Sequence, residues 1–330
     1  MHEYYLGLDV GSVSTNLVLV DDENRIISSQ YIRTNGQPLE TVKMGLRKMK
    51  EQFPPDSVIR GAGTTGSGRQ LAAIMIGADV VKNEITAHAT ATVQFMPNVR
   101  TIFEIGGQDS KIIVVENQMV TDFAMNTVCA AGTGSFLDHQ AERLGIPIEE
   151  FGDKAATAER DVRIAGRCTV FAESDMIAKQ QFGFSKSEII KGLCEALVRN
   201  YINNLGRGKK LEPPFVFQGG VAANKGIKAA FEKEIGHPVT IPENYHIMGA
   251  LGAAILARDH LRAENRKTGF RGFEAAELDF VPETFDCEDC PNHCEVIQVR
   301  VSGEVAARWG DRCGKWTGSL AASVPRIDGV

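Results

Sequence analysis

The 330-residue sequence has no long apolar run and no excess of basic residues. Because a helix that spans a bilayer needs about 18 or more consecutive apolar residues, we expect no membrane span. The N-terminus, MHEYYLGLDV, leads directly into strand-like sequence, so we expect no signal peptide either. A net charge of −6 argues against nucleic acid as a partner.

The signs of a secreted, disulfide-bonded chain are also absent. Seven cysteines occur without a secretory signal. This indicates a reducing compartment, the cytoplasm, where grouped thiols bind metals more often than they form disulfides. The composition, with 43% apolar and 24% charged residues, is ordinary for a globular protein, and the length suits about two domains.

The chain contains an internal duplication. Strand-like and helix-like segments alternate, which predicts an α/β fold, and TIFEIGGQDSKIIVVEN at 101–117 repeats the opening pattern YLGLDVGSVSTNLVLVDD. The matched positions are Asp9 with Glu104, Gly11 with Gly106, Ser12 with Gly107, and residues 17–20 with 112–115. We interpret this as a duplicated β-hairpin whose two turns serve one site.

The two turns have the composition of phosphate clamps. Glycines let backbone N–H groups approach phosphate oxygens, while Asp9 and Glu104 would hold magnesium or orient the attacking water. The residues expected to line the phosphates are Gly11, Ser12, Ser14, Thr15, Gly106, Gly107, Gln108 and Asp109. A third glycine motif, FVFQGGVAAN, predicts a strand, a turn and a helix, with Gly219, Gly220 and Asn224 near adenosine.

Two cysteines precede predicted helices. Cys129 stands before a glycine-rich turn in NTVCAAGTGSFLDHQAERL, where apolar residues at helical spacing predict a helix that begins near Thr133. Cys168 leads a second helical pattern in AGRCTVFAESDMIAK. A helix N-terminus lowers the pKa of a thiol, so this pair suits a soft, negatively charged group. We include Gly132 in the cofactor site and interpret Cys194, in mid-helix, as a packing residue.

The hairpins and the third glycine motif resemble the phosphate-1, phosphate-2 and adenosine motifs of the actin, hexokinase and heat-shock-chaperone ATPases. More narrowly, DVGSVST, EIGGQDSK, CAAGTGSFLD, CTVFAESD and GGVAAN resemble the activators of 2-hydroxyacyl-CoA dehydratases. The ATP-binding subunits of benzoyl-CoA reductase belong to the same group. The resemblance covers about residues 3–261, and Glu104 stands where Asp is common in the group.

The resemblance implies two related domains that close on ATP, and a homodimer with one oxygen-sensitive 4Fe-4S cluster at its interface. ATP hydrolysis would drive an electron to an iron–sulfur partner, such as a hydroxyacyl-CoA dehydratase or an aromatic-ring reductase, with ferredoxin or flavodoxin as the donor. A cubane cluster needs about four thiolates. Cys129 and Cys168 supply two per chain, which suffices only when a second chain supplies the others.

The segment GAGTTG at 61–66 matches the dinucleotide-binding fingerprint letter for letter. A dinucleotide-binding unit would also need a second parallel strand that ends in an acid for the ribose, and the sequence around Glu84 instead predicts a helix start. We therefore interpret the match as an ordinary strand–turn–helix connection.

The C-terminal segment carries a separate metal signature. Cys287, Cys290 and Cys294 in CEDCPNHC are followed by Cys313, a spacing that suits either a zinc knuckle or a second iron–sulfur cluster. His293 could replace one cysteine as a ligand, and Trp309 and Trp316 are expected to cover the small core of this module.

We expect the chain to divide into four parts. These are a first ATPase half at 1–98, a second half at 99–261, a linker at 262–283 and a four-cysteine metal module at 284–330. Two other functions fit the same residues. One is an amino-sugar kinase on the same fold, and the other is an ATP-switched sensor or chaperone with a zinc knuckle.

Overall fold

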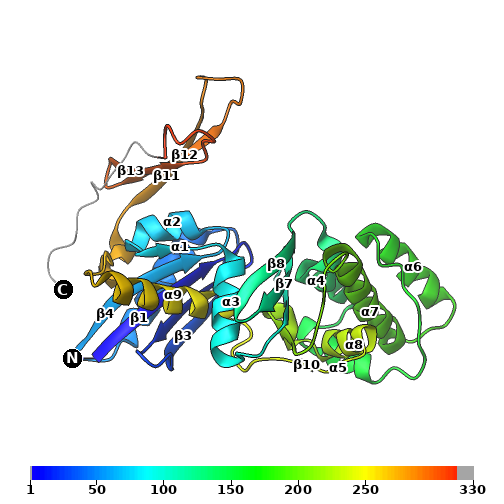
Figure 1. Ribbon diagram of the computed structural model, residues 1–330. Coiled ribbons are helices and arrows are strands. Elements are labelled where there is room, and N and C mark those ends of the chain that lie inside the picture. Colours follow the sequence, from blue (N-terminus) through cyan, green and yellow to red (C-terminus); the bar gives the residue numbers. More distant parts are fainter. Residues whose placement is uncertain (1, 318–330) are drawn as a thin grey trace. The chain divides into compact units, whose positions relative to one another are not determined.

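The chain forms two compact units, one made of Met1–Asn83 with Gly249–Val330 and the other of Glu84–Met248. The computed structural model describes residues 2–317 (Figure 1). These boundaries differ from the predicted halves, because helix α3 (Glu84–Phe95) opens the second unit and helix α9 (Met248–Glu264) returns to the first. None of the helices in the described part of the chain combines the length and apolarity that a bilayer crossing requires.

Each unit contains one five-stranded sheet, and the two sheets have the same topology. The first has the order β3 (Ile26–Arg33), β2 (Ser14–Val20), β1 (His2–Val10), β4 (Ser57–Thr65) and β5 (Val80–Val81). The second has the order β8 (Met119–Asn126), β7 (Ser110–Glu116), β6 (Thr101–Ile105), β9 (Phe215–Gln218) and β10 (Val239–Thr240). Antiparallel pairs join the first three strands of each sheet, and parallel pairs join the rest. The predicted duplication of the hairpin is thus confirmed.

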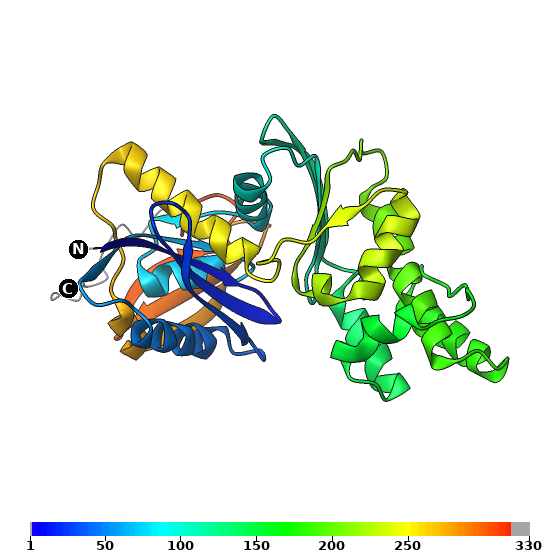
Figure 2. The same cartoon turned by 90° about the horizontal axis from the view of Figure 1, so that it is seen from below.

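Helices cover both faces of the first sheet (Figure 2). The side chains of Leu6 and Leu8 pack with α1 (Pro38–Glu51) and α2 (Arg69–Ile76) in one core. The opposite face approaches α9 closely, since a Cβ added at Gly7 would lie only 1.9 Å from the carbonyl oxygen of Ala250. This agrees with the prediction that the small, apolar segment 246–261 packs close against a sheet.

The second unit is organised around the long helix α7 (Lys186–Leu205). A capping box between Ser185 and Glu188 begins this helix, and its buried face joins the aromatic core of the sheet through Tyr201. The other helical elements are η1 (Ala130–Gly132), α4 (Gly134–Leu144), α5 (Ile148–Ala156), α6 (Thr169–Gln181), η2 (Gly220–Ala223) and α8 (Lys225–Ile235).

The C-terminal segment forms a three-stranded antiparallel sheet with β11 (Phe280–Asp286), β12 (Glu295–Val301) and β13 (Glu304–Trp309). Val299 and Val301 of this sheet share the core of the first unit. Trp309 packs against the same core, while the Trp316 ring stands edge-on to Phe285 at 5.1 Å. The C-terminal sheet is therefore packed onto the first unit and shares part of the apolar core of that unit.

The predicted linker at 262–283 is attached to the first unit along its length. Its 3₁₀ turn η3 (Phe273–Glu277) buries Phe273 in the core, and Arg47 of α1 forms an ion pair with Glu277 at 2.7 Å. Because these side chains are packed and paired, the segment is part of a domain and not a free connection.

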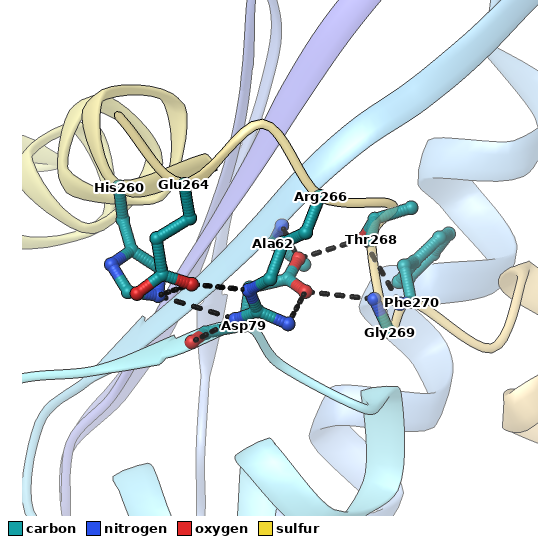
Figure 3. Close-up of polar contacts among 8 residues, drawn as sticks. All are labelled: Ala62, Asp79, His260, Glu264, Arg266, Thr268, Gly269 and Phe270. Carbon is teal, nitrogen blue, oxygen red and sulfur yellow. Dashed lines mark hydrogen bonds and ion pairs between the residues drawn. The ribbon is translucent and has the colours of Figure 1, made fainter. Parts of the chain in front are cut away.

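Asp79 holds the start of this segment (Figure 3). One carboxylate oxygen accepts hydrogen bonds from the Ala62 N–H at 2.9 Å and from the Thr268 hydroxyl at 2.7 Å. The other oxygen accepts from the Gly269 N–H at 2.7 Å. Arg266 lies beside the same carboxylate and also bonds to Glu264. A buried carboxylate with three hydrogen bonds fixes the chain after α9 to the edge of the first sheet.

Candidate functional site

The turn between β6 and β7 carries a buried charge cluster. The Lys111 ammonium lies 2.9 Å from the Glu104 carboxylate, 2.8 Å from Asp109 and 2.9 Å from Glu84 on α3. Glu104 is only 4% exposed and Lys111 only 2%. Three carboxylates thus share one ammonium, which supplies the counter-charge that buried carboxylates need.

The environment shifts the pKa values of this cluster. Burial raises the pKa of Glu104 to about 7, although Lys111 partly offsets this effect. Burial lowers the pKa of Lys111, but Glu104, Asp109 and Glu84 outweigh it and hold the pKa well above its ordinary value. Glu104, expected on magnesium or water, is thus paired with Lys111. Neither Lys111 nor Glu84 was predicted for the site, although Lys111 ends the motif EIGGQDSK.

The end of β9 lies beside Glu104. Gln218 is fully buried; it accepts a hydrogen bond from the Thr92 hydroxyl at 2.8 Å and bonds to the His88 ring at 3.0 Å. Burial lowers the pKa of His88 to about 4, so the ring is neutral near pH 7. Gly219 follows with a φ of +89°, and a Cβ there would lie 2.6 Å from the Glu104 carboxylate. The structure therefore brings two of the predicted glycine motifs together in the second unit.

In the first unit, Asp9 lies at the end of β1 beside the turn at 66–68. Gly66 has a φ of +91°, and a Cβ there would lie 2.6 Å from the Asp9 carboxylate. The Gly68 N–H donates to the Val10 carbonyl at 2.8 Å. Five residues of GAGTTG lie in β4 and Gly66 begins the turn before α2, so the predicted strand–turn–helix connection is confirmed.

Asp9 shares a row across three strands with Asn16 and Thr65. The Asn16 Oδ1 and Thr65 Oγ1 atoms are buried and make no hydrogen bond to any residue from 2 to 317. Buried polar atoms need partners, so this row fits a hydrated cation or ordered water next to Asp9. The donor set, one carboxylate and two neutral oxygens, is of the kind that magnesium prefers.

Three of the predicted lining residues have supporting roles. The Thr15 side chain is fully buried and bonds to the Thr34 hydroxyl at 3.0 Å, below the turn and not on its surface. Asn224 caps α8 by accepting from the Ile227 N–H at 3.1 Å. Gly132 is buried in the loop after Cys129. The other predicted lining residues differ in exposure. The exposed ones are Ser12, Gln108 and Gly220, and the half-buried ones are Gly11, Ser14, Gly106, Gly107 and Asp109.

The loop that carries Cys129 is attached to the turn between β6 and β7. Helix α4 begins at Gly134, one residue after the predicted start, and its first N–H groups donate to the carbonyls of Gly106 at 2.9 Å and Gly107 at 2.8 Å. The Ser135 hydroxyl also donates to Gly107, at 2.6 Å. Cys129 is the N-cap residue of the short η1 and not of α4, whereas Cys168 is the N-cap residue of the 13-residue α6, and neither side chain makes a capping hydrogen bond.

Cys129 and Cys168 are half-exposed, whereas Cys194 is 1% exposed. Cys194 belongs to the apolar core of the second unit, which confirms its packing role, and burial raises the pKa of its thiol to about 12. Large apolar side chains next to both half-exposed cysteines face solvent, with Val128 at 94% and Phe171 at 66% exposure. Surfaces of this kind favour burial against another protein chain.

The four C-terminal cysteines lie at one end of their sheet. Cys287, Cys290 and Cys294 belong to the β11–β12 loop, and Cys313 follows β13. Because β12 is antiparallel to both neighbours, the two loops meet at the same end. Asp289 raises the pKa of Lys315, and Cys287 and Cys313 add to this effect. Among residues 2–317, however, no three His, Cys, Asp or Glu side chains are assembled as a metal site.

Two sheets of the same topology, each with a glycine turn beside an acid, define the class of this protein. It is an ATPase with the actin/hexokinase-like fold. Residues 6–257 match the model of the BadF/BadG/BcrA/BcrD ATPase family, and the chain belongs to this family. The resemblance inferred from the sequence motifs is thereby confirmed. The match ends at residue 257, so η3 and β11–β13 lie beyond it.

Individual relatives match most of the chain. The (R)-2-hydroxyglutaryl-CoA dehydratase activating ATPase of Acidaminococcus fermentans is 35% identical over 78% of this chain and 98% of that protein. The activator of lactoyl-CoA dehydratase of Anaerotignum propionicum is 34% identical over 77% and 97%. The solved activator of the 2-hydroxyisocaproyl-CoA dehydratase from Clostridium difficile with bound ADPNP has a TM-score of 0.72 at 30% identity, over 79% and 97%.

Proposed function

We propose that this protein is an ATP-hydrolysing activator that delivers single low-potential electrons to an iron–sulfur partner enzyme. The partner would be a 2-hydroxyacyl-CoA dehydratase or a related reductase, in line with the names of the relatives. The electron donor would be ferredoxin or flavodoxin, and the compartment the cytoplasm.

The glycine turns would bind the nucleotide. Backbone N–H groups at Ser12 and Gly107 would hold phosphate oxygens, because those of Gly11 and Gly106 already donate to the Ser14 and Asp109 carbonyls within their turns. The adenosine would lie near Gly219 and Gly220. Magnesium would bind next to Asp9, whose row contains buried oxygens in need of a partner. A carboxyl with a pKa near 7 is suited to accept the proton of the attacking water, a role that we assign to Glu104.

A 4Fe-4S cluster held by Cys129 and Cys168 of two chains would supply the low-potential electron. Two half-exposed thiolates per chain fit this count, and the exposed Val128 and Phe171 fit burial against a second copy. The observation that carries the proposal is the attachment of α4 to Gly106 and Gly107, since it ties the Cys129 loop to a nucleotide turn. A rearrangement of that turn on hydrolysis would therefore move the Cys129 loop.

We also propose that Cys287, Cys290, Cys294 and Cys313 hold a zinc ion or a second iron–sulfur cluster. The support is the sequence spacing together with the shared sheet end. Metal binding would then require the two loops to draw together around the ion.

Iron and sulfide per dimer test the proposal. After anaerobic purification we expect about four iron atoms per dimer in the ATPase body. Cys129→Ala should abolish this cluster, whereas Cys194→Ala should retain it. Replacing Cys287, Cys290, Cys294 and Cys313 together by serine should reveal what the C-terminal cysteines hold, and it keeps the strands that share the core of the first unit. A colourless, air-stable protein that phosphorylates an amino sugar would refute the proposal in favour of a kinase. Nucleotide binding without iron or redox activity would favour a sensor or chaperone.

A further inference from the structure

Both cysteine loops rest on the same turn of α7. Asn200, which is 7% exposed, donates from its side-chain amide to the Gly166 carbonyl at 2.7 Å, two residues before Cys168. On the other side, a Cβ added at Gly132, in the loop after Cys129, would lie 3.2 Å from the Asn200 Oδ1 atom. One side chain thus lies between two loops that are far apart in sequence.

The loop before Cys168 is fixed to α7 at several points. A Cβ added at Gly166 would lie 2.6 Å from the Ala196 carbonyl, so only glycine allows this approach. Arg199 donates to the Ile164 carbonyl at 2.9 Å, next to the bond that Asn200 makes. Successive residues of one rigid helix therefore hold this loop.

The loop of Cys129 is fixed from within by Asn126. Its Oδ1 atom accepts from the Cys129 N–H at 2.9 Å, and its Nδ2 donates to the Cys129 carbonyl at 2.7 Å. A Cβ added at Gly132 would also lie 3.5 Å from the Asn126 Nδ2 atom. Asn126, Gly132 and Asn200 are therefore neighbours, which places the turn around Cys129 directly against α7.

The orientation of the Asn200 amide is itself determined. Asn204, one turn later on α7, donates to Asn200 Oδ1 at 3.1 Å. An amide oxygen that accepts this bond leaves the Nδ2 group toward Gly166, where it can donate. Asn204 therefore fixes the direction in which the Asn200 amide donates. We call Asn200, with its contacts to Gly166, Gly132 and Asn204, the bracket between the two cysteine loops.

We propose that Asn200 is a positioning residue that sets the separation between Cys129 and Cys168. The bracket rests on the geometry above, and its role in holding a cluster rests on the proposed function. When each chain supplies two thiolates to a shared group, the spacing of those thiolates has to be fixed by the supporting residues. Asn200 and its neighbours on α7 supply that support.

The test uses Asn200→Asp in the full chain, with Asn203→Asp as the matched control on the exposed side of the same helix. An ionised aspartate cannot donate to the Gly166 carbonyl and repels it. We expect hydrogen–deuterium exchange in segment 164–169 to rise about tenfold in Asn200→Asp, the usual effect of a lost buried hydrogen bond. Exchange in segment 126–133 should rise less, because Gly132 only packs against the Asn200 side chain. The control should leave both segments unchanged.

A milder variant guards against misfolding of Asn200→Asp. Asn204→Ala removes only the group that orients Asn200, and we expect a smaller increase in exchange in the same two segments. An increase confined to one segment, or none in either, would overturn the bracket. Hydrogen–deuterium exchange needs no cluster, so this experiment tests the bracket independently of the proposed function.

The positioning role has its own measurement. In protein that holds iron, Asn200→Asp should shift the electron paramagnetic resonance signal of the reduced centre and speed iron loss to a chelator about tenfold. An unchanged signal together with faster exchange would show that Asn200 serves folding alone and would refute the positioning role. If the wild type holds no iron, the proposed function fails. The cross-linking rate of Cys129 with Cys168 then decides the role of Asn200, because an unchanged rate in Asn200→Asp would refute it.

Discussion

The two glycine-turn sites have the same backbone and different side chains. Each places an acid at the end of a strand, with one neighbour across the hairpin and another on the parallel strand. The rows are Asn16–Asp9–Thr65 in the first unit and Lys111–Glu104–Gln218 in the second. Gly66 and Gly219 follow at matching positions, both with positive φ and both in close approach to the acid.

The difference between the rows assigns different chemistry to the two acids. Asp9 faces a neutral amide and a hydroxyl, a setting that favours a cation. Glu104 faces an ammonium in a buried site that raises its pKa to about 7, a setting that favours proton transfer. Helix α3 completes only the second row, through Glu84 and His88. The two rows thus share their geometry, and under the proposed function their different neighbours give the two acids different tasks.

Neutralising each acid tests this division and should give the largest effect. Glu104→Gln should lower ATP turnover about a hundredfold to ten-thousandfold, the range expected for loss of a general base, without changing the magnesium requirement. Asp9→Asn should raise the magnesium concentration needed for half-maximal turnover. Steady-state hydrolysis at varied magnesium separates the two. If both variants show the same magnesium profile, the acids share one task and the comparison fails.

Replacing Lys111 should affect stability more than replacing its counterpart Asn16. Lys111→Met leaves buried carboxylates without a counter-charge, which costs about 3–5 kcal/mol in the free energy of unfolding. Asn16→Leu removes a buried oxygen that has no hydrogen bond within residues 2–317, so we expect a change below about 1 kcal/mol. Urea denaturation without nucleotide measures both. Equal losses would mean that the charge cluster is no more important than the neutral row.

The change in the free energy of unfolding at acid pH should depend on His88, which bonds to Gln218 of the second row. Burial holds the pKa of His88 at about 4 in the folded chain against 6.5 for the free side chain. The unfolded chain therefore binds the His88 proton first, and the contribution of this group is lost as pH falls from about 6.5 to 4, by about 3 kcal/mol. Glu104 opposes it over the same window, because burial raises its pKa from 4.5 to about 7 and the folded chain binds that proton first. In His88→Asn this part of the slope should vanish, and in the exposed control His139→Asn it should persist. Denaturation midpoints between pH 7 and 4.5 show the slope, and an unchanged slope in His88→Asn would contradict the prediction.

The sequence was most informative where the duplication repeated itself. The two hairpins, the acids and the third glycine motif could be aligned from residue types alone, because strand periodicity and glycine turns are local properties. The sequence of GAGTTG predicts only a plain connection, yet Gly66 occupies the position that Gly219 has in the second unit. The shared feature is a close approach to an acid on another strand, and this becomes visible only when the strands are paired.

The residues that were missed act across elements. Glu84, His88 and Asn200 lie on helices, and their partners lie 20 or more residues away on other elements. No local pattern distinguishes such a residue from any other polar residue of a helix. The linker at 262–283 was misjudged for the same reason, since its charged residues pair with α1, and Asp79 accepts hydrogen bonds from its backbone and hydroxyl groups. The composition of a segment shows that it is polar, but it does not show whether other elements supply ion-pair or hydrogen-bond partners for its side chains.

The smallest expected effect concerns the one attachment that the second turn has and the first lacks. The Gly11 carbonyl of the first turn accepts from the Thr34 hydroxyl. In the second turn its counterpart Gly106 and the next residue, Gly107, both accept from the N-terminus of α4, which follows Cys129. Ser135→Ala removes one of the two bonds to Gly107 and keeps the backbone bond, a loss of about 1 kcal/mol.

If this attachment transmits the nucleotide state, the effect of ADP on the alkylation rate of Cys129 should shrink about fivefold in Ser135→Ala. Peptide mass spectrometry measures that rate with and without ADP, and Ser174→Ala, a change in an exposed hydroxyl of α6, should leave the ADP effect intact. Should Ser135→Ala respond to ADP as the wild type does, the backbone bonds alone would carry the coupling. The second turn would then differ from the first in its charges but not in this hydroxyl contact.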